Sequence, residues 1–349
     1  MAYQFAVYLH KKNPSSWENN KLAGEDWLKG FRHRNKTLSL RSPEPTSLAR
    51  AIAFNRVNVN KFFDNPEKLL ERYSSCIHSI FNLDETGIKP VQKPCKILCA
   101  AGTKQVGKVV VAECGTTVTM CNCINAMGNA LPPAYIFPRV NFKQHLLHGA
   151  PTGSLGMASK SGWMPAELFV PVLQHFVKHM NVSAENPAIL VLDNHAPHIS
   201  IEPIGVAREH GLVLLTLPPH CSHRMQPLDV AVHGPFKQFY ASFADAWQIS
   251  NPGQSMNISN VADLSGKAYY KAFTPENITS GFRAAGTCPY NRNVFDESIF
   301  MPAIVTGQNF NSADQNEGRE EAVSSSANLQ SETPVSVEGA SECSDHQEP

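Results

Sequence analysis

The spacing of apolar residues along the chain changes near residue 76. Before this point the spacing is helical, and segment 22–34 also carries acidic residues early and basic residues late, the order that a helix dipole favours. Pro43 and Pro45 then break the chain. Further helices are predicted at three places, residues 47–54, a helix capped by Asn58 that runs through Phe63, and residues 66–73.

Short β-branched runs follow residue 76, and helical stretches separate some of them. Strands are predicted at 77–83, 106–112, 116–124, 134–137, 188–192 and 212–217. Helices are predicted at 165–180 and 229–247. The fold class is therefore mixed α/β, with early strands close enough together along the chain to be antiparallel.

The run AILVL at 188–192 is apolar on both faces, which is typical of a central strand. Asp193 follows it at the carboxyl end, where α/β sheets bind their ligands. The run LVLLTLPP is predicted to be its buried neighbour.

Two helices in the last third of the chain carry clear signals. The helix from Asp229 has an apolar stripe that would dock it on the sheet, formed by Val232, Phe236, Phe239, Phe243 and Trp247. Asp229 would then lie on its first turn. Thr274 as N-cap, Pro275 at the first helical position and Gly286 beyond the end mark another helix.

Composition narrows the class of protein. The chain has 349 residues, of which 42% are hydrophobic, and no apolar run approaches the roughly 18 residues of a membrane span. The start lacks the features of a signal peptide, and the nine scattered cysteines are typical of reduced thiols. We therefore expect a cytosolic or nuclear protein without a membrane partner.

The zero net charge hides an uneven distribution. Residues 1–310 hold 29 basic and 21 acidic residues, whereas residues 311–349 hold nine acidic residues and one arginine. Within residues 1–75 there are 13 basic and seven acidic residues. The basic N-terminal part suggests a polyanionic partner, although solvated helix faces have a similar composition. Residues 303–349 have the composition of a disordered acidic tail.

Three aspartates, Asp84, Asp193 and Asp229, are predicted at two strand ends and one helix start, where their side chains would converge on one edge of the sheet. Three carboxylates in one pocket repel one another unless they are protonated or bind a cation. Oxygen ligands indicate Mg²⁺ or Mn²⁺, and two such ions would catalyse displacement at a phosphodiester. Taken singly, each aspartate has a structural alternative, respectively a turn, an Asx-turn and a helix cap.

Other polar residues flank these aspartates. His195 and His198 would position the attacking water, shuttle protons or contact phosphate, or else bind backbone groups of their loop. Glu85, next to Asp84 on an extended chain, would face the other way. Cys221 and His223 raise the alternatives of a thiol nucleophile or a zinc ligand pair, but no further ligands follow at a recognisable spacing.

A basic group lies on and just after the helix at 22–34, interleaved with Trp27 and Phe31. Its members are Lys29, Arg32, Arg34, Lys36 and Arg41. We expect these side chains to contact the phosphates of DNA, the alternative being an ordinary solvated face.

Four motifs, LDETG, LVLDNHAPH, LPPHCSHRMQPLDVAVHGPFK and GFRAAGTCPYNRNVF, closely resemble in their order those of DDE-superfamily transposases of the pogo, Tigger and Jerky type. The resemblance covers about residues 20–300. It implies an RNase H-like catalytic fold whose metal ligands are Asp84, Asp193 and Asp229, with 35 residues between the second and third. It also implies two Mg²⁺ or Mn²⁺ ions, DNA cleavage and strand transfer, a nuclear location and a possible homo-oligomer on DNA.

The N-terminal segment resembles the end of the centromere-protein-B-type helix-turn-helix of that family. The expected domains are a partial helix-turn-helix at 1–75, the endonuclease at 76–302 and the tail at 303–349. Because such transposases carry two helix-turn-helix units and Met1 begins inside the second, the chain is expected to be a fragment or a truncated copy. The alternative function is that of a catalytically inactive DNA-binding or chromatin-associated protein retained by its host.

Overall fold

The computed structural model describes residues 2–40, 46–73, 79–90 and 117–305. Its centre is a six-stranded sheet in the order β4-β3-β2-β1-β5-β6. The strands are β1 (Ile80–Ile88), β2 (Val118–Asn125), β3 (Ala134–Pro138), β4 (Leu155–Ser159), β5 (Ala188–Leu192) and β6 (Leu212–Thr216). The strand predicted at 106–112 lies outside the described residues.

The sheet is mixed. β2 is antiparallel to both of its neighbours, β1 and β3, whereas β3 with β4, β1 with β5 and β5 with β6 are parallel pairs. The predicted antiparallel early strands and the predicted pairing of β5 with β6 are confirmed. β5 is buried along its whole length, whereas β6 is the edge strand and is only partly buried. This is the mixed α/β sheet that the sequence predicts.

Strand β4 was not predicted from the sequence, because LGMAS has no β-branched residue and contains Gly156. The structure shows why this strand carries a glycine. A Cβ atom at residue 156 would lie 2.2 Å from the Phe142 ring, which packs against this edge of the sheet.

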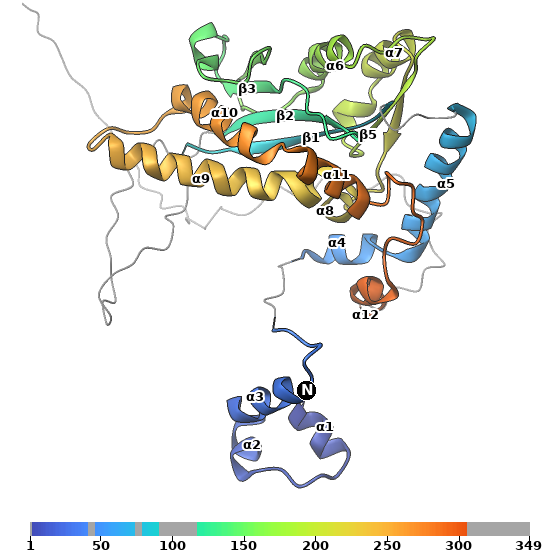
Figure 1. The fold of residues 1–349 in the computed structure, drawn as a ribbon, viewed down its shortest axis with the longest axis vertical. Helices are drawn as coiled ribbons and strands as arrows, with labels where there is room; N and C mark the ends of the chain where they lie inside the picture. Colours follow the sequence, from blue (N-terminus) through green and yellow to red (C-terminus); the bar gives the residue numbers. More distant parts are fainter. Residues whose placement is uncertain (1, 41–45, 74–78, 91–116, 306–349) are drawn as a thin grey trace, which may run out of the picture. The chain divides into compact units, whose positions relative to one another are not determined.

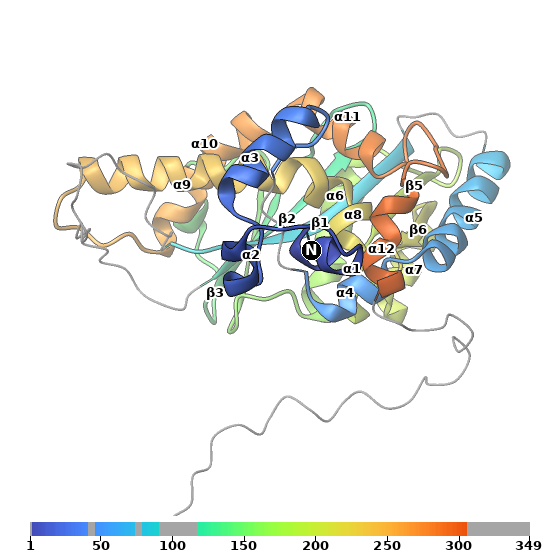
Figure 2. The same ribbon diagram turned by 90° about the horizontal axis from the view of Figure 1, so that it is seen from below.

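One face of the sheet is covered by α9 (His233–Ser250), α10 (Val261–Ala272) and α11 (Pro275–Ala284), as Figure 1 shows. Helices α9 and α10 lie side by side (Figures 1 and 2). These helices bury the first core against alternate residues of β1 and β2. The predicted stripe on α9 was wrong at Phe239, which is exposed, because Tyr240 takes the buried position. The helix predicted at 274–286 is confirmed, with Thr274 accepting a hydrogen bond from the Asn277 amide.

The opposite face is covered by α6 (Ala166–Met180) and α7 (Ile201–Glu209), which bury the second core. Helix α6 confirms the prediction at 165–180, whereas α7 was not predicted. Five short helical segments connect the larger elements, namely η2 (Gln144–Leu147), η3 (Ala196–Ile199), η4 (Leu228–Val232), η5 (Ile258–Asn260) and η6 (Glu297–Phe300).

Five helices precede the sheet, α1 (Ala2–Tyr8), α2 (Ser15–Asn20), α3 (Glu25–Arg34), α4 (Leu48–Ala53) and α5 (Arg56–Tyr73). Helices α3 and α4 confirm two predictions. The two helices predicted after residue 57 are in fact one, with Pro66 inside it. Asn58 is not its cap, because Oδ1 of Asn55 accepts the Asn58 amide hydrogen at 2.9 Å.

A third core joins α4 and α5 to the sheet, to α8 (Ser222–Met225) and to η6. The helix α12 (Met301–Val305), which follows η6, contacts α4. Phe54, Val59, Phe62 and Phe63 pack there with residues of β5, β6 and the C-terminal segment. Arg292 ties that segment to Asp64 and, at 3.2 Å, to Glu67 of α5. The part that packs on the sheet therefore includes α4 and α5, which precede the expected boundary at residue 75, and the C-terminal segment with Phe295 and Phe300. The expected domain boundaries stay a prediction. Residues 306–349, most of the expected tail, lie outside the described part.

None of the described helices is long and apolar enough to cross a membrane.

Candidate active site

Asp84 lies in the middle of β1 rather than at a strand end, which corrects the sequence prediction. The apolar run stops at Leu83, but the strand continues to Ile88 because it pairs with β2 along its whole length. Asp84 is the cross-strand partner of Asn122. Its side chain is 12% exposed, so the sheet itself holds this carboxylate in a nearly buried position.

Asp229 lies on η4, a single π-helical turn before α9, rather than on the α-helix predicted from residue 229. Buried amide side chains hold this turn against the sheet. Asn82 donates to the Val191 carbonyl at 3.0 Å and accepts from the Leu228 amide at 3.0 Å. Gln226 donates to the Leu83 carbonyl at 2.7 Å. Because the turn is fixed to β1 and β5, Asp229 has a defined position beside Asp84.

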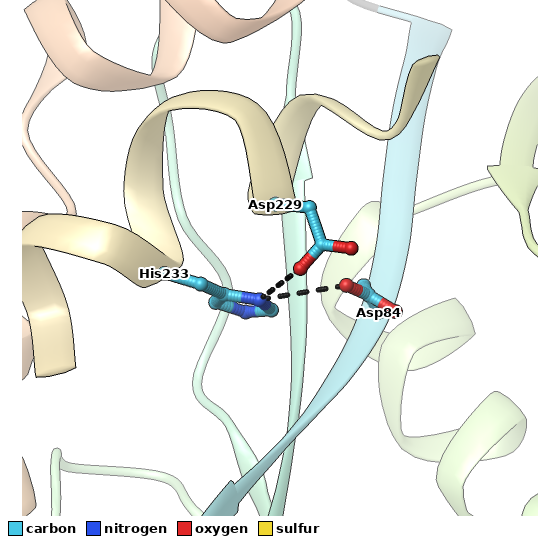
Figure 3. A group of neighbouring side chains, drawn as sticks. All are labelled: Asp84, Asp229 and His233. Atoms are coloured by element: carbon cyan, nitrogen blue, oxygen red, sulfur yellow. Dashed lines mark hydrogen bonds and ion pairs between the residues drawn. The ribbon is translucent and has the colours of Figure 1, made fainter. Parts of the chain in front are cut away.

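Asp84, Asp229 and His233 form a compact cluster (Figure 3). Each offers one ligand atom, and these atoms lie within 4.8 Å of one another. Nδ1 of His233 is 3.3 Å from Oδ1 of Asp229 and 3.4 Å from Oδ2 of Asp84. On the other side of the ring, Nε2 lies 3.3 Å from the amide nitrogen of the buried Asn122. The histidine therefore stands between two carboxylates and an amide.

The electrostatics of this cluster indicate a missing positive charge. Burial, followed by the negative charge of Asp229, raises the pKa of Asp84 well above its usual range. Burial also acts to raise the pKa of Asp229, but the hydrogen bond from His233 and nearby positive charge, including that of Lys237, outweigh it and hold this pKa low. Burial lowers the pKa of His233, which favours the neutral ring. Two acidic groups thus face a neutral imidazole, a donor set that fits a divalent cation.

Asp193 directly follows β5, at the predicted strand end, but its nearest charged partner is His198. Nδ1 of His198 lies 2.7 Å from Oδ1 of Asp193, without the alignment of a linear hydrogen bond, and Nε2 lies 3.0 Å from Oε1 of Glu85. Burial opposes the charged ring, but the close contacts with the carboxylates of Asp193 and Glu85 raise the pKa of His198 to about 9. The same contacts hold the pKa of Asp193 low despite its partial burial. Phe169 packs on the ring with centroids 4.3 Å apart.

The structure therefore brings together two of the three predicted aspartates in one ligand cluster. Asp84 and Glu85, adjacent on β1, take part in different clusters, as the alternation of a strand predicts. The charge of Asp193 reaches Asp84 and contributes to its raised pKa, but the Asp193 carboxylate belongs to the cluster with His198. The Asx-turn alternative for Asp193 is also present, since its Oδ1 accepts from the His195 amide at 3.3 Å.

The two histidines predicted near Asp193 have different environments. The side chain of His198 is only 4% exposed and bridges two carboxylates, whereas the ring of His195 is exposed, with its centroid 5.6 Å from that of His198. His233 was not singled out from the sequence. The sequence spacing could have predicted its position, because Asp229 and His233 are four residues apart and side chains with this spacing lie next to each other on one face of a helix.

Cys221 and His223 do not form a nucleophilic pair. The Cys221 thiol is buried and donates to the Ala53 carbonyl, at 3.5 Å, and burial raises its pKa to about 12. Nδ1 of His223 faces the His220 carbonyl at 3.1 Å. This environment makes Cys221 a residue of the third core, and the thiol-nucleophile alternative is wrong.

The predicted DNA-binding residues of α3 are exposed. Lys29, Arg32 and Arg34 lie on this helix and Lys36 just after it, whereas Arg41 lies outside the described residues. Lys29 forms an exposed ion pair with Asp26 at 3.4 Å. Trp27 stacks on Phe31 with centroids 5.0 Å apart and meets Trp17 of α2 edge-on. The aromatic side chains thus pack together and leave the basic ones to solvent, an arrangement compatible with both sequence interpretations.

Comparison with solved structures finds Mos1 transposase. The chain is 13% identical to the Mos1 mariner paired end complex with Mn, with a TM-score of 0.47 and coverage of 82% of this chain and 75% of that one. For the catalytic domain of Mos1 mariner transposase, the identity is 12%, the TM-score 0.34, and the coverage 70% and 98%.

A curated relative, the MFS-type transporter clz9 of Cochliobolus lunatus, is 28% identical over 231 residues, which are 64% of this chain and 24% of that protein. The chain thus spans about a quarter of the length of this relative. Residues 115–282 match the model of the DDE superfamily endonuclease family, a range that includes Asp193 and Asp229 and begins after Asp84. The chain therefore carries a DDE superfamily endonuclease domain.

Proposed function

We propose that this chain is a transposase-type DDE endonuclease that cleaves DNA phosphodiesters with Mg²⁺ or Mn²⁺ held by Asp84 and Asp229. The observation that carries the proposal is the approach of two carboxylates, the nearly buried Asp84, whose pKa is strongly raised, and Asp229 at the exposed side of the site. Carboxylates this close together repel one another unless they are protonated or bind a cation, and Asp229 lies within the residues that an endonuclease family matches.

The residues around the site would have separate tasks. When bound, divalent ions would polarise the scissile phosphate and activate a water or a 3′-hydroxyl for in-line attack. Asp84, fixed by β1, and Asp229, fixed by η4, would hold an ion. Asp193 would complete a second ion's ligands, oriented by the ion pair with His198 that Glu85 supports in turn. The two-ion arrangement and the pogo, Tigger and Jerky relationship remain parts of this proposal.

DNA would be bound outside the catalytic cluster. Lys29, Arg32, Arg34, Lys36 and Arg41 would contact backbone phosphates, consistent with the exposure of the four that the structure describes. The Mos1 matches include a paired-end complex with a left transposon end, and we propose DNA as the partner of this chain and a homo-oligomer on DNA as its form. A nuclear location is part of the same proposal.

Cleavage of supercoiled plasmid by the purified chain tests the proposal. We expect nicking with Mg²⁺ or Mn²⁺, none with EDTA, and a loss of about 100-fold or more in Asp84→Asn, Asp229→Asn and Asp193→Asn, because each removes a ligand charge. Asp296→Asn, at an exposed position far along the chain, is the matched control. Cleavage that persists in EDTA, or that all three variants retain, would refute the metal-dependent mechanism.

One observation favours a second candidate, a DNA-binding protein without catalysis. The Asp193 carboxylate is paired with His198 rather than with the other two aspartates. This candidate predicts DNA binding that needs no divalent ion and weakens with salt, with Arg32→Ala and Arg34→Ala lowering the affinity for all sequences alike. Binding of this kind together with no cleavage under any metal would favour it over the endonuclease.

A further inference from the structure

We propose that His233 is an imidazole ligand of the cation held by Asp84 and Asp229, so that the site selects a first-row transition-metal ion over Mg²⁺. The inference rests on the proposed function for the presence of a cation. The three-aspartate pattern predicts a site with oxygen ligands only. The inference goes beyond the proposed function because it adds a nitrogen ligand and, with it, a preference among metals.

The spacing of the donor atoms supports this assignment. Nδ1 of His233 lies 3.3 Å from the nearer oxygen of Asp229 and 3.4 Å from that of Asp84. Adjacent ligands of an ion bound at about 2.1 Å stand roughly 3 Å apart. Two of the three donor pairs are therefore already close to the spacing of ligands around one cation, and all three donor atoms lie within 4.8 Å of one another. The His233 side chain is 3% exposed, and the residue begins α9 directly after the turn η4 that carries Asp229, so its place in the site is fixed by packing.

Asn122 supplies a second, independent observation. This side chain is fully buried, and its Oδ1 atom has no hydrogen-bond partner among the residues that the structure describes. Its Nδ2 atom lies 3.3 Å from Nε2 of His233. In this amide orientation Nε2 accepts, so Nδ1 carries the proton and donates to the two carboxylates.

Rotation of the Asn122 amide would exchange these roles. Oδ1 would then accept from Nε2–H, and the lone pair on Nδ1 would face the carboxylates, as it must to bind a metal ion. Metal-binding histidines usually donate their second ring nitrogen to a neighbouring oxygen, which fixes the tautomer. The Asn122 oxygen supplies such an acceptor only after this rotation, which exchanges the hydrogen bond that Nδ2 now donates to the Met120 carbonyl at 3.2 Å for one from His233.

The donor set decides the preference among metals. Mg²⁺ favours oxygen ligands and retains its water molecules, whereas imidazole binds first-row transition-metal ions more readily. A site of two carboxylates and one imidazole therefore favours Mn²⁺ over Mg²⁺ more strongly than the same site without the imidazole.

Mn²⁺ alone, added to the full chain, is the probe. Pulsed electron paramagnetic resonance detects nitrogen bound directly to Mn²⁺, and labelling histidine with ¹⁵N identifies the residue type. We expect a ¹⁴N coupling that converts to ¹⁵N on labelling and is lost in His233→Gln. In that variant Mn²⁺ affinity should fall roughly 10-fold or more and Mg²⁺ affinity, measured by competition, distinctly less. His179→Gln, at an exposed position on α6, is the matched control and should retain both the coupling and the affinity.

The outcomes separate this inference from the proposed function. Mn²⁺ that binds in a manner sensitive to Asp84→Asn and Asp229→Asn but shows no nitrogen coupling would overturn the role of His233 and leave the carboxylate site intact. Mn²⁺ binding that is indifferent to both substitutions would overturn the site itself. If His233→Gln does not fold, His233→Phe, which keeps an aromatic ring in the buried position, provides a second variant, and a nitrogen coupling that persists in it would overturn the assignment to His233.

Discussion

Individual side chains near the site carry out different tasks on the two faces of β1. On one face, Asp84 and Asp229 approach each other beside a neutral imidazole, which leaves a place for a cation. On the other, His198 already supplies the positive charge between Asp193 and Glu85. The cluster of Asp84, Asp229 and His233 is therefore suited to binding a cation. In the other cluster, His198 holds the Asp193 carboxylate in a fixed orientation.

The His198 cluster contributes to stability in a pH-dependent way. Its folded-state pKa of about 9 lies above the ordinary value of 6.5, so the stabilisation is complete below pH 6.5 and is lost as the pH rises through about 9. We expect His198→Gln to lower the free energy of unfolding at pH 6 by about 3 kcal/mol. Urea unfolding in EDTA should show this difference shrinking by pH 10, and His179→Gln should show none. A difference that stays constant with pH would contradict the charged state of His198.

The buried thiol of Cys221 should be chemically inert. Because burial raises its pKa to about 12, almost no thiolate forms at pH 8. Iodoacetamide should modify Cys221 only after unfolding, as mapped by mass spectrometry of the digested protein. Cys221→Ala should retain plasmid cleavage. Rapid alkylation in the folded protein would show that the third core opens at this point.

Elements place the site through backbone contacts. The turn η4 is held on one side by Asn82 and Gln226 and on the other by α11, where Gly281 approaches it closely. A Cβ atom at residue 281 would lie 2.5 Å from the Pro227 carbonyl oxygen. The position of Asp229 thus depends on a glycine about fifty residues later in the sequence.

Gly281→Ala should disturb the site without touching an aspartate. The added methyl group must push η4 away from its place, so we expect a loss of Mn²⁺ affinity of about 10-fold together with reduced stability of about 1–3 kcal/mol. Gly205→Ala on α7 is the matched control, since a Cβ atom there meets nothing within 4 Å and alanine favours a helix. Titration of Mn²⁺ and thermal unfolding of both variants would check this. Equal behaviour of the two would contradict the role of the α11 contact.

At the scale of the whole molecule, the helices α4 and α5 complete the body that contains the sheet. Their side chains Phe54, Val59, Phe62 and Phe63 cover residues of β5 and β6 in the third core. Burial of four such side chains is worth roughly 6–12 kcal/mol in total, comparable to the stability of an entire domain. The endonuclease match begins well after these helices, yet the sheet needs them.

Two fragments test this dependence. A chain of residues 46–305 keeps the third core. A chain of residues 79–305 lacks α4 and α5, so the apolar side chains of the third core that belong to β5, β6 and the C-terminal segment become exposed to solvent. We expect the first to unfold cooperatively, and the second to aggregate or to unfold at a temperature at least 10 °C lower. Circular dichroism melting and gel filtration would measure both. Equal stability of the two fragments would show that the helices are dispensable.

The sequence predicted the helices and strands whose own residues carry a clear pattern. Strand β5 was recognisable because AILVL is apolar on both faces, and α11 because Thr274, Pro275 and Gly286 mark its ends. Strand β4 and the continuation of β1 past Leu83 depend on neighbouring strands, which a single segment does not reveal. The two helices predicted after residue 57 form the single helix α5 for a similar reason. Pro66 by itself predicts a break, and packing against the rest of the protein keeps the helix continuous.

In the site, too, the local sequence predicted some features and not others. It identified the three aspartates as candidate ligands, but which of them lie in one cluster depends on the face of the sheet to which each side chain points. Asp84 and Glu85 are sequence neighbours in separate clusters, and Asp193 pairs with a histidine five residues later. His233 enters the cluster because the π-helical turn and α9 together bring residues four apart to the same carboxylate.

The location of bound Mn²⁺ tests the central claim most directly. Crystals of the chain grown with Mn²⁺, measured near the manganese absorption edge, should give an anomalous difference peak between the carboxylates of Asp84 and Asp229, next to the His233 ring. The same experiment on Asp84→Asn should show that peak weakened or absent. A structure with ordered side chains and no anomalous peak at these residues, or with manganese bound only elsewhere, would contradict the account.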